Sequence, residues 1–161
     1  MDLAAREALD MAHDDIGDRD RRVTPGHWVA DAVPREIARL RAALGAFARS
    51  LGAPDALVDD VRLAVTEALA NAVMHAYHDG ALGRVDARAS ADPAAGLMTV
   101  RVRDYGMGYR RRADSPGMGQ GLAIMAALAR TIDVASPPDG GTEVRLTFAV
   151  PAAPQPQPLS P

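Results

Sequence analysis

The 161-residue chain contains no cysteine, and this absence removes several kinds of chemistry at once. It excludes disulfide bonds, thiolate metal sites and cysteine-based catalysis. Lysine is missing too, because all 18 basic residues are arginine. The chain therefore has no P-loop lysine, no lysine of the eukaryotic protein-kinase type and no Schiff-base chemistry. Backbone amides, arginine side chains and a metal ion would have to hold the phosphates of any bound nucleotide.

Long apolar runs are also absent, and aromatic residues make up only 4% of the chain. No run approaches the roughly 20 apolar residues that a membrane-spanning helix needs. The first residues, MDLAAREALDMAHDD, lack the charged-then-apolar order of a secretory signal. A net charge of −3 does not suggest a broad surface for nucleic acid. We therefore expect a cytoplasmic protein that binds neither a membrane nor DNA directly.

The length and the 48% hydrophobic content predict one globular domain, which we place at residues 23–150. Residues 1–22 form a charged leader, which we interpret as disordered chain or a short helix with a frayed end. Residues 151–161 form a proline-rich tail, PAAPQPQPLSP, which we expect to be disordered.

Apolar spacing predicts three helices. The first has Pro34 near its first turn and Gly52 just past its end, and its apolar stripe is Ile37, Leu40, Leu44, Phe47 and Leu51. The second opens at Pro54, and its apolar face is Val61, Val65, Ala68, Leu69, Ala72, Val73 and Ala76. The third is expected from about residue 119 to residue 130.

Alternating apolar residues predict strands at 27–33, 83–90, 96–104, 131–136 and 142–150. Two of the connections, ADPAA and SPPDGG, are short enough for hairpins. Hairpins favour an antiparallel sheet over a parallel, doubly wound one. We therefore predict an α+β fold, a two-layer sandwich of about three helices on a mostly antiparallel sheet.

Three polar residues, Glu67, Asn71 and His75, recur every four positions along the second helix. At about 100° per residue, they are predicted to lie roughly opposite the apolar stripe. Asn71 is the only asparagine, and its amide oxygen suits Mg²⁺. Glu67 could take a proton from an attacking hydroxyl. The alternatives are a solvated helix face for this set and packing on Tyr77 for His75.

Two glycine motifs follow. In the first, Asp104 ends a predicted strand and precedes Gly106 and Gly108, so its carboxylate could accept a hydrogen bond from an adenine amino group while backbone approaches the ring. An ordinary strand-to-loop turn is the alternative. In the second, Gly117, Gly119 and Gly121 lead into a helix, where free N–H groups could cradle phosphate. The alternative for this run is a flexible connector.

In this order, VTEALANAVMHAY, VRDYGMGY and GMGQGL resemble the N, G1 and G2 boxes of the GHKL ATPase and kinase superfamily. The first segment is most similar to bacterial anti-sigma-factor serine kinases of the RsbW/SpoIIAB type. The resemblance covers roughly Trp28 to Phe148. Two features depart from the pattern: the lid between Gly108 and Gly117 is short, and the leader and tail have no counterpart.

The resemblance implies a role for each site residue. Asn71 would be the Mg²⁺ ligand, Glu67 the catalytic base and Asp104 the adenine anchor, with Thr142 supporting the base. The other residues that would bind ATP are His75, Gly106, Gly108, Gly117, Gly119, Gly121 and Leu122. One of Arg110, Arg111 and Arg112 in the lid could contact the γ-phosphate, although a solvated basic loop fits equally well.

The implied function is an anti-sigma regulatory factor that phosphorylates a serine of its antagonist, a STAS-type protein, and sequesters a sigma factor. Such proteins are commonly homodimers. One alternative is a sensor histidine kinase catalytic domain, which usually carries asparagine where Glu67 stands. Another is an ATP-binding partner switch that transfers no phosphate.

Overall fold

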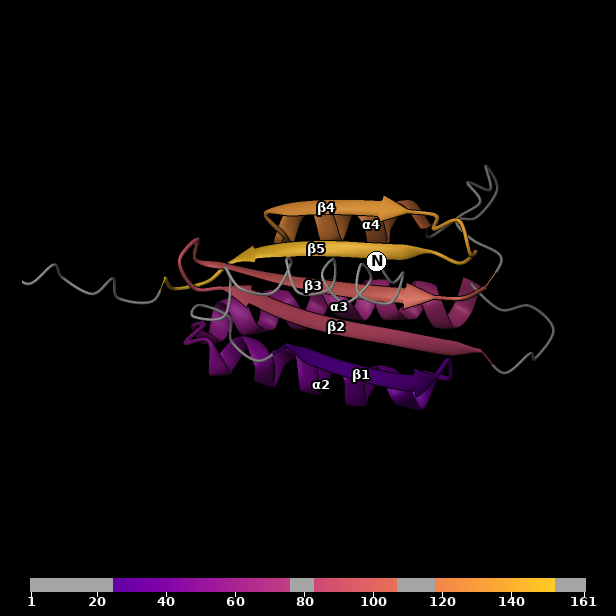
Figure 1. Cartoon of the computed structure of the whole chain (residues 1–161), viewed down its shortest axis with the longest axis horizontal. Coiled ribbons are helices and arrows are strands. Elements are labelled where there is room, and N and C mark those ends of the chain that lie inside the picture. The colour runs from indigo at the N-terminus through magenta and orange to yellow at the C-terminus, as the bar shows by residue number, and fades with distance from the viewer. Residues whose placement is uncertain (1–24, 76–82, 107–117, 153–161) are drawn as a thin grey trace, which may run out of the picture.

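The computed structural model describes residues 25–75, 83–106 and 118–152, which form two layers (Figure 1). One layer is a five-stranded antiparallel sheet, and the other consists of helices that all lie behind the sheet in Figure 1. This arrangement confirms the predicted α+β two-layer sandwich. The leader, most of the tail, Arg110 to Arg112, Gly108 and Gly117 lie outside the described residues.

The helices follow the predicted apolar stripes closely. Helix α2 spans Pro34–Ser50, α3 spans Asp55–His75 and α4 spans Met118–Leu128. Proline at the first turn of α2 suits its fixed backbone angle. Gly52, with φ of 76°, follows the end of α2 in the left-handed conformation that glycine adopts readily. None of the helices in the described part of the chain is long and apolar enough to cross a membrane.

The strands are β1 (Gly26–Asp31), β2 (Arg84–Asp92), β3 (Leu97–Asp104), β4 (Thr131–Ala135) and β5 (Glu143–Ala149). Their spatial order is β1-β2-β3-β5-β4, so both predicted hairpins are confirmed. Strand β1 stops at Asp31, two residues before the predicted end at Val33. Val33 is instead the extended N-cap of α2, because Pro34 already begins the helix.

The core lies between the helices and one face of the sheet. Its largest fully buried side chains are Phe148, Leu40, Leu44, Leu69, Met98, Met125 and Leu146. Every second residue of β3 faces this core, and Asp104 occupies the last of these inward positions. The opposite, helix-free face of the sheet carries arginines from β2, β3 and β5. Asp104 therefore lies on the core side of the sheet, at the end of its strand.

Candidate nucleotide site

Asp104 is 5% exposed, and its carboxylate is held by backbone N–H groups from two segments. The amide of Gly106 donates to Oδ1 at 2.9 Å, and the amide of Thr142 donates to the same oxygen at 3.2 Å. Neither backbone hydrogen bond uses Oδ2. The carboxylate is thus fixed by the protein while one oxygen can accept a hydrogen bond from a ligand.

The turn before β5 approaches β3 more closely than any side chain would permit. Gly140 and Gly141 have φ values of 91° and 77°, in the left-handed region. A Cβ atom on Gly141 would lie 2.0 Å from the carbonyl oxygen of Asp104. The amide of Gly141 donates to the carbonyl of Gly106 at 3.0 Å, and the amide of Asp104 donates to the carbonyl of Thr142 at 3.0 Å. The glycine pair therefore brings Thr142 beside Asp104.

Burial raises the pKa of the Asp104 carboxyl above its ordinary value of 3.8, because the charged form loses hydration. Hydrogen bonds from the Gly106 and Thr142 amides and from the Thr142 hydroxyl oppose this shift by favouring the charged form. A desolvated acceptor in such a place can recognise an amino group on a ligand, as the adenine hypothesis requires.

Glu67 and Asn71 lie on α3 where α4 packs against it, and both are half-buried. A Cβ atom on Gly121 of α4 would lie 2.9 Å from Oε2 of Glu67 and 3.7 Å from Nδ2 of Asn71. The alternative of a fully solvated helix face therefore does not hold for Glu67 and Asn71. The helical spacing of α3 alone gives no information about α4, which covers this side of the helix.

The remaining predicted residues are placed less fully. Gly106 follows β3 with only Tyr105 between them, and Gly119 and Gly121 lie in the first turn of α4. Leu122 is 37% exposed. His75 is the last residue of α3, and its side chain lies outside the described residues.

Sequence reasoning missed Arg103 and Asp139, which form an ion pair beside the Asp104 turn at 2.5 Å. It also missed the close approach of Gly141 to the strand. The signal that could have found the close approach was the run Asp-Gly-Gly-Thr, where two consecutive glycines indicate backbone that a side chain would block.

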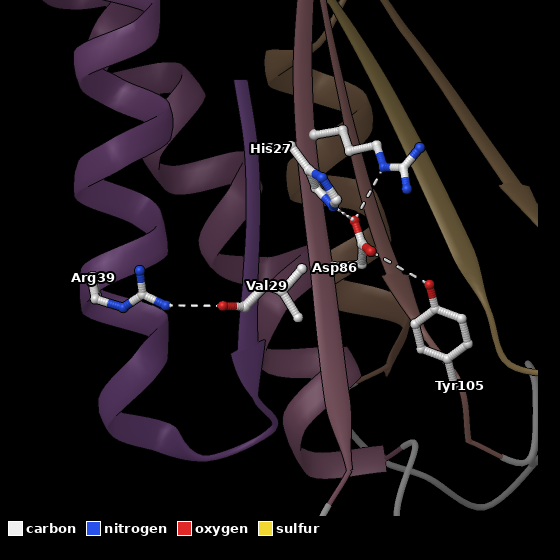
Figure 2. Close-up of polar contacts among 6 residues, drawn as sticks. His27, Val29, Arg39, Asp86 and Tyr105 are labelled. Carbon is white, nitrogen blue, oxygen red and sulfur yellow. Dashed lines mark hydrogen bonds and ion pairs between the residues drawn. The ribbon is translucent and has the colours of Figure 1, made fainter. Parts of the chain in front are cut away.

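A second buried carboxylate, Asp86, lies on the helix-free face of the sheet (Figure 2). It is 5% exposed and accepts hydrogen bonds from His27 Nε2 at 2.8 Å, Arg88 Nε at 3.2 Å and the Tyr105 hydroxyl at 3.4 Å. These donors come from three neighbouring strands or their ends, so Asp86 joins them across the sheet. Its partners satisfy a buried charge, which is a structural role.

Comparison with known proteins assigns most of the chain to a family of ATPase domains. Residues 30–148 match the family model described as the histidine kinase-like ATPase domain. A probable sensor histidine kinase from Mycobacterium tuberculosis strain CDC 1551 is 33% identical over 157 residues, which cover 80% of this chain and 40% of that protein. The anti-sigma F factor of Clostridium beijerinckii is 28% identical over 117 residues, covering 65% of this chain and 79% of that protein.

A solved structure of the RsbU and RsbW domains of Rv1364c from Mycobacterium tuberculosis superposes with a TM-score of 0.60 at 27% identity. The match covers 81% of this chain and 33% of that one. The chain thus spans less than half the length of this sensor histidine kinase and less than half the length of the RsbU–RsbW chain. With a family model matched over most of its length and the sheet, helices and motif order in agreement, this chain belongs to the GHKL-type histidine kinase-like ATPase domain family.

Proposed function

We propose that the protein binds Mg-ATP between the end of β3 and the start of α4. The carrying observation is that Gly121 of the third motif lies against Glu67 and Asn71 of the first. Asp104 and Thr142 would hold the adenine, and the backbone at the start of α4, around Gly119 and Gly121, would face the phosphates. A helix N-terminus suits phosphate because its free N–H groups and its dipole favour negative charge.

The donor set near Gly121 fits Mg²⁺ delivered with a nucleotide and fits a permanent metal centre poorly. The described residues contain no cluster of three or more histidine, aspartate or glutamate ligands. Mg²⁺ bound with ATP needs only one or two protein oxygens, because phosphate oxygens and water complete its shell. Asn71 would supply such an oxygen, and the ion would neutralise charge on the phosphates.

We further propose that the protein is a serine kinase of the anti-sigma type, with Glu67 as the general base. Glu67 sits one helical turn from Asn71, so it can take the proton of a substrate hydroxyl that approaches the phosphate end of the nucleotide. The substrate would be a serine of a STAS-type antagonist. The protein, acting as a homodimer in the cytoplasm, would sequester a sigma factor. The names of its anti-sigma F relatives support the sigma-factor part of this proposal.

A sensor histidine kinase catalytic domain is the second candidate, favoured by the name of the Mycobacterium tuberculosis relative at 33% identity. The residue that separates the two is Glu67, because a carboxylate base serves a hydroxyl acceptor that must lose a proton, whereas histidine kinases usually carry asparagine here. A third candidate, a nucleotide-binding partner switch without phosphotransfer, uses the same binding residues.

Calorimetry with ATP and ADP, with and without Mg²⁺, tests the binding step. Absence of binding at millimolar nucleotide would refute the proposed function. Incubation with radiolabelled ATP and candidate antagonist proteins then separates the three candidates. Acid-stable phosphoserine on the antagonist supports the serine kinase, acid-labile phosphohistidine supports the sensor kinase, and binding without transfer supports the switch.

The partner proposal has its own test by pull-down with sigma factors and antagonists. We expect a sigma factor to be retained and then released by the unphosphorylated antagonist. Direct binding to promoter DNA, or simultaneous binding of both proteins without mutual effect, would rule out partner switching.

A further inference from the structure

The turn that precedes Thr142 needs an external support. It contains two consecutive glycines at positive φ, and glycine loses more conformational freedom on ordering than any other residue. One backbone hydrogen bond, from Gly140 to the carbonyl of Pro137 at 2.9 Å, closes the turn internally. The Gly141 amide also donates to the Gly106 carbonyl at 3.0 Å, so the position of Thr142 beside Asp104 depends on contacts between this permissive turn and the end of β3.

Arg103 supplies that support from the other face of the sheet. Adjacent residues of a strand point to opposite faces, so Arg103 lies on the helix-free face while Asp104 lies on the core side. Its Nη2 contacts Oδ1 of Asp139 at 2.5 Å, and Asp139 directly precedes the two glycines. The ion pair thereby connects the end of β3 to the turn that carries Thr142.

The guanidinium of Arg103 is itself held in place. Its carbon lies 4.8 Å from the centre of the Tyr105 ring, and Arg84 lies 4.5 Å from the centre of the same ring. A cation at this distance from an aromatic ring is attracted by its π electrons. The Arg103 side chain is only 23% exposed, whereas that of Asp139 is 67% exposed, so the arginine is the fixed member of the pair.

We propose that Arg103 is a positioning residue for base recognition, acting through Asp139 to hold Gly141 and Thr142 against Asp104. This inference rests on the proposed nucleotide function, since Asp104 is assigned there to adenine. Neither Arg103 nor Asp139 contacts the base. Their effect is to reduce the number of arrangements that Thr142 and the Asp104 carboxylate can adopt before a nucleotide binds, and such preorganisation strengthens binding.

The test measures the dissociation constants of ATP and ITP for the wild type, Arg103→Gln, Asp139→Asn and the double variant. ITP lacks the amino group that Asp104 would recognise. We expect each single variant to weaken ATP about two- to fivefold while ITP changes little, because a partly exposed ion pair has a modest effect. The double variant should bind ATP as tightly as the single variant with the larger loss of affinity, because both changes remove the same ion pair.

Matched controls come from the same face of the sheet. Arg101→Gln removes an exposed arginine two residues earlier on β3, and Asp133→Asn removes an exposed aspartate of β4. Neither residue lies in the turn, so both variants should bind ATP and ITP as the wild type does. Equal loss of ATP and ITP affinity, or unchanged ATP affinity in Asp139→Asn, would overturn the proposal.

A nucleotide-free measurement keeps the two proposals distinguishable. Hydrogen exchange of the Thr142 and Gly106 amides, both bonded to Asp104 Oδ1, should be faster in Asp139→Asn than in Asp133→Asn. If wild type binds no ATP, the proposed function fails, and this exchange still decides whether the ion pair holds the turn. Should Arg103→Gln not fold, the exposed Asp139→Asn change carries the test alone.

Discussion

Asp104 and Thr142 are joined by two backbone-directed hydrogen bonds in opposite senses. The Asp104 amide donates to the Thr142 carbonyl at 3.0 Å, and the Thr142 amide donates to the Asp104 carboxylate at 3.2 Å. The first bond extends the ladder between β3 and β5, and the second closes it with a side chain. A carboxylate held in this way takes its position from the pairing of β3 with the segment that leads into β5.

Replacing Asp104 with asparagine should weaken ATP binding while leaving the fold intact. The amide oxygen can still accept from Gly106 and Thr142, but the other position becomes an NH₂ group that faces the adenine amino group as a second donor. Loss of a charge-assisted hydrogen bond costs about 1.5–3 kcal/mol, which corresponds to about a 10- to 100-fold higher dissociation constant. Calorimetry checks this, and ATP affinity equal to the wild type would show that Asp104 does not contact the base.

The same substitution should change how stability depends on pH. Burial raises the pKa of Asp104 in the folded state, so the native protein binds this proton more readily than the unfolded chain. Stability from this group is therefore full below 3.8 and is lost as pH rises through the raised pKa. Asp139 has the opposite sign, because Arg103 lowers its pKa, but it is common to both proteins.

We thus expect the Asp104→Asn variant to gain stability relative to the wild type as pH rises from about 4 towards neutrality. Denaturant unfolding of the two proteins across this pH range measures the difference in their free energies of unfolding. Titratable groups other than Asp104 are common to both proteins, so their contributions cancel in this difference. A difference that falls with increasing pH would mean that hydrogen bonds outweigh burial at this carboxyl.

Much of the fold followed from local pattern. The predicted stripe from Ile37 to Leu51 includes Leu40 and Leu44, which α2 buries, and the alternation along β3 likewise specifies which side of the strand is buried. Two hairpin-length connections then favour antiparallel pairing. These features depend on residues close in sequence, which is why they could be predicted.

The parts of the site that could not be predicted depend on contacts distant in sequence. The Arg103–Asp139 pair joins residues 36 positions apart, and it forms only because β5 lies next to β3. The burial of Glu67 and Asn71 likewise depends on α4, which a helical wheel of α3 does not contain. Motif order predicted which residues belong together, and packing determined how they face one another.

Gly121→Ala should separate stability from chemistry. Its Cβ would lie 2.9 Å from Oε2 of Glu67, so the carboxylate would have to move. Alanine is a better helix former than glycine by about 1 kcal/mol. This gain should offset the cost of moving the Glu67 side chain, so we expect the free energy of unfolding to stay close to that of the wild type. Phosphotransfer should decrease by about 10²-fold, the effect expected when a reacting group is displaced by about 1 Å.

Radiolabel transfer to the antagonist and denaturant unfolding measure the two effects. Gly45→Ala on α2 is the matched control. Its Cβ would meet the flexible side chain of Arg62, which has no role in the proposed site. We expect it to transfer phosphate at the wild-type rate. A Gly121→Ala protein with full activity would show that Glu67 tolerates the added methyl group.

Glu67→Gln should retain ATP affinity and lose phosphotransfer. Glutamine has the same shape as glutamate and keeps the contact with Gly121, but it cannot accept a proton. Removing a general base reduces the rate by about 10²–10⁴-fold. Single-turnover transfer of labelled phosphate, run beside ATP calorimetry, separates this loss from a binding defect.

Glu36→Gln on α2, where the glutamate pairs with Arg39 at 2.6 Å, is the control and should leave transfer unchanged. Equal transfer rates for Glu67→Gln and the wild type would mean that another group accepts the proton, or that the reaction needs no base.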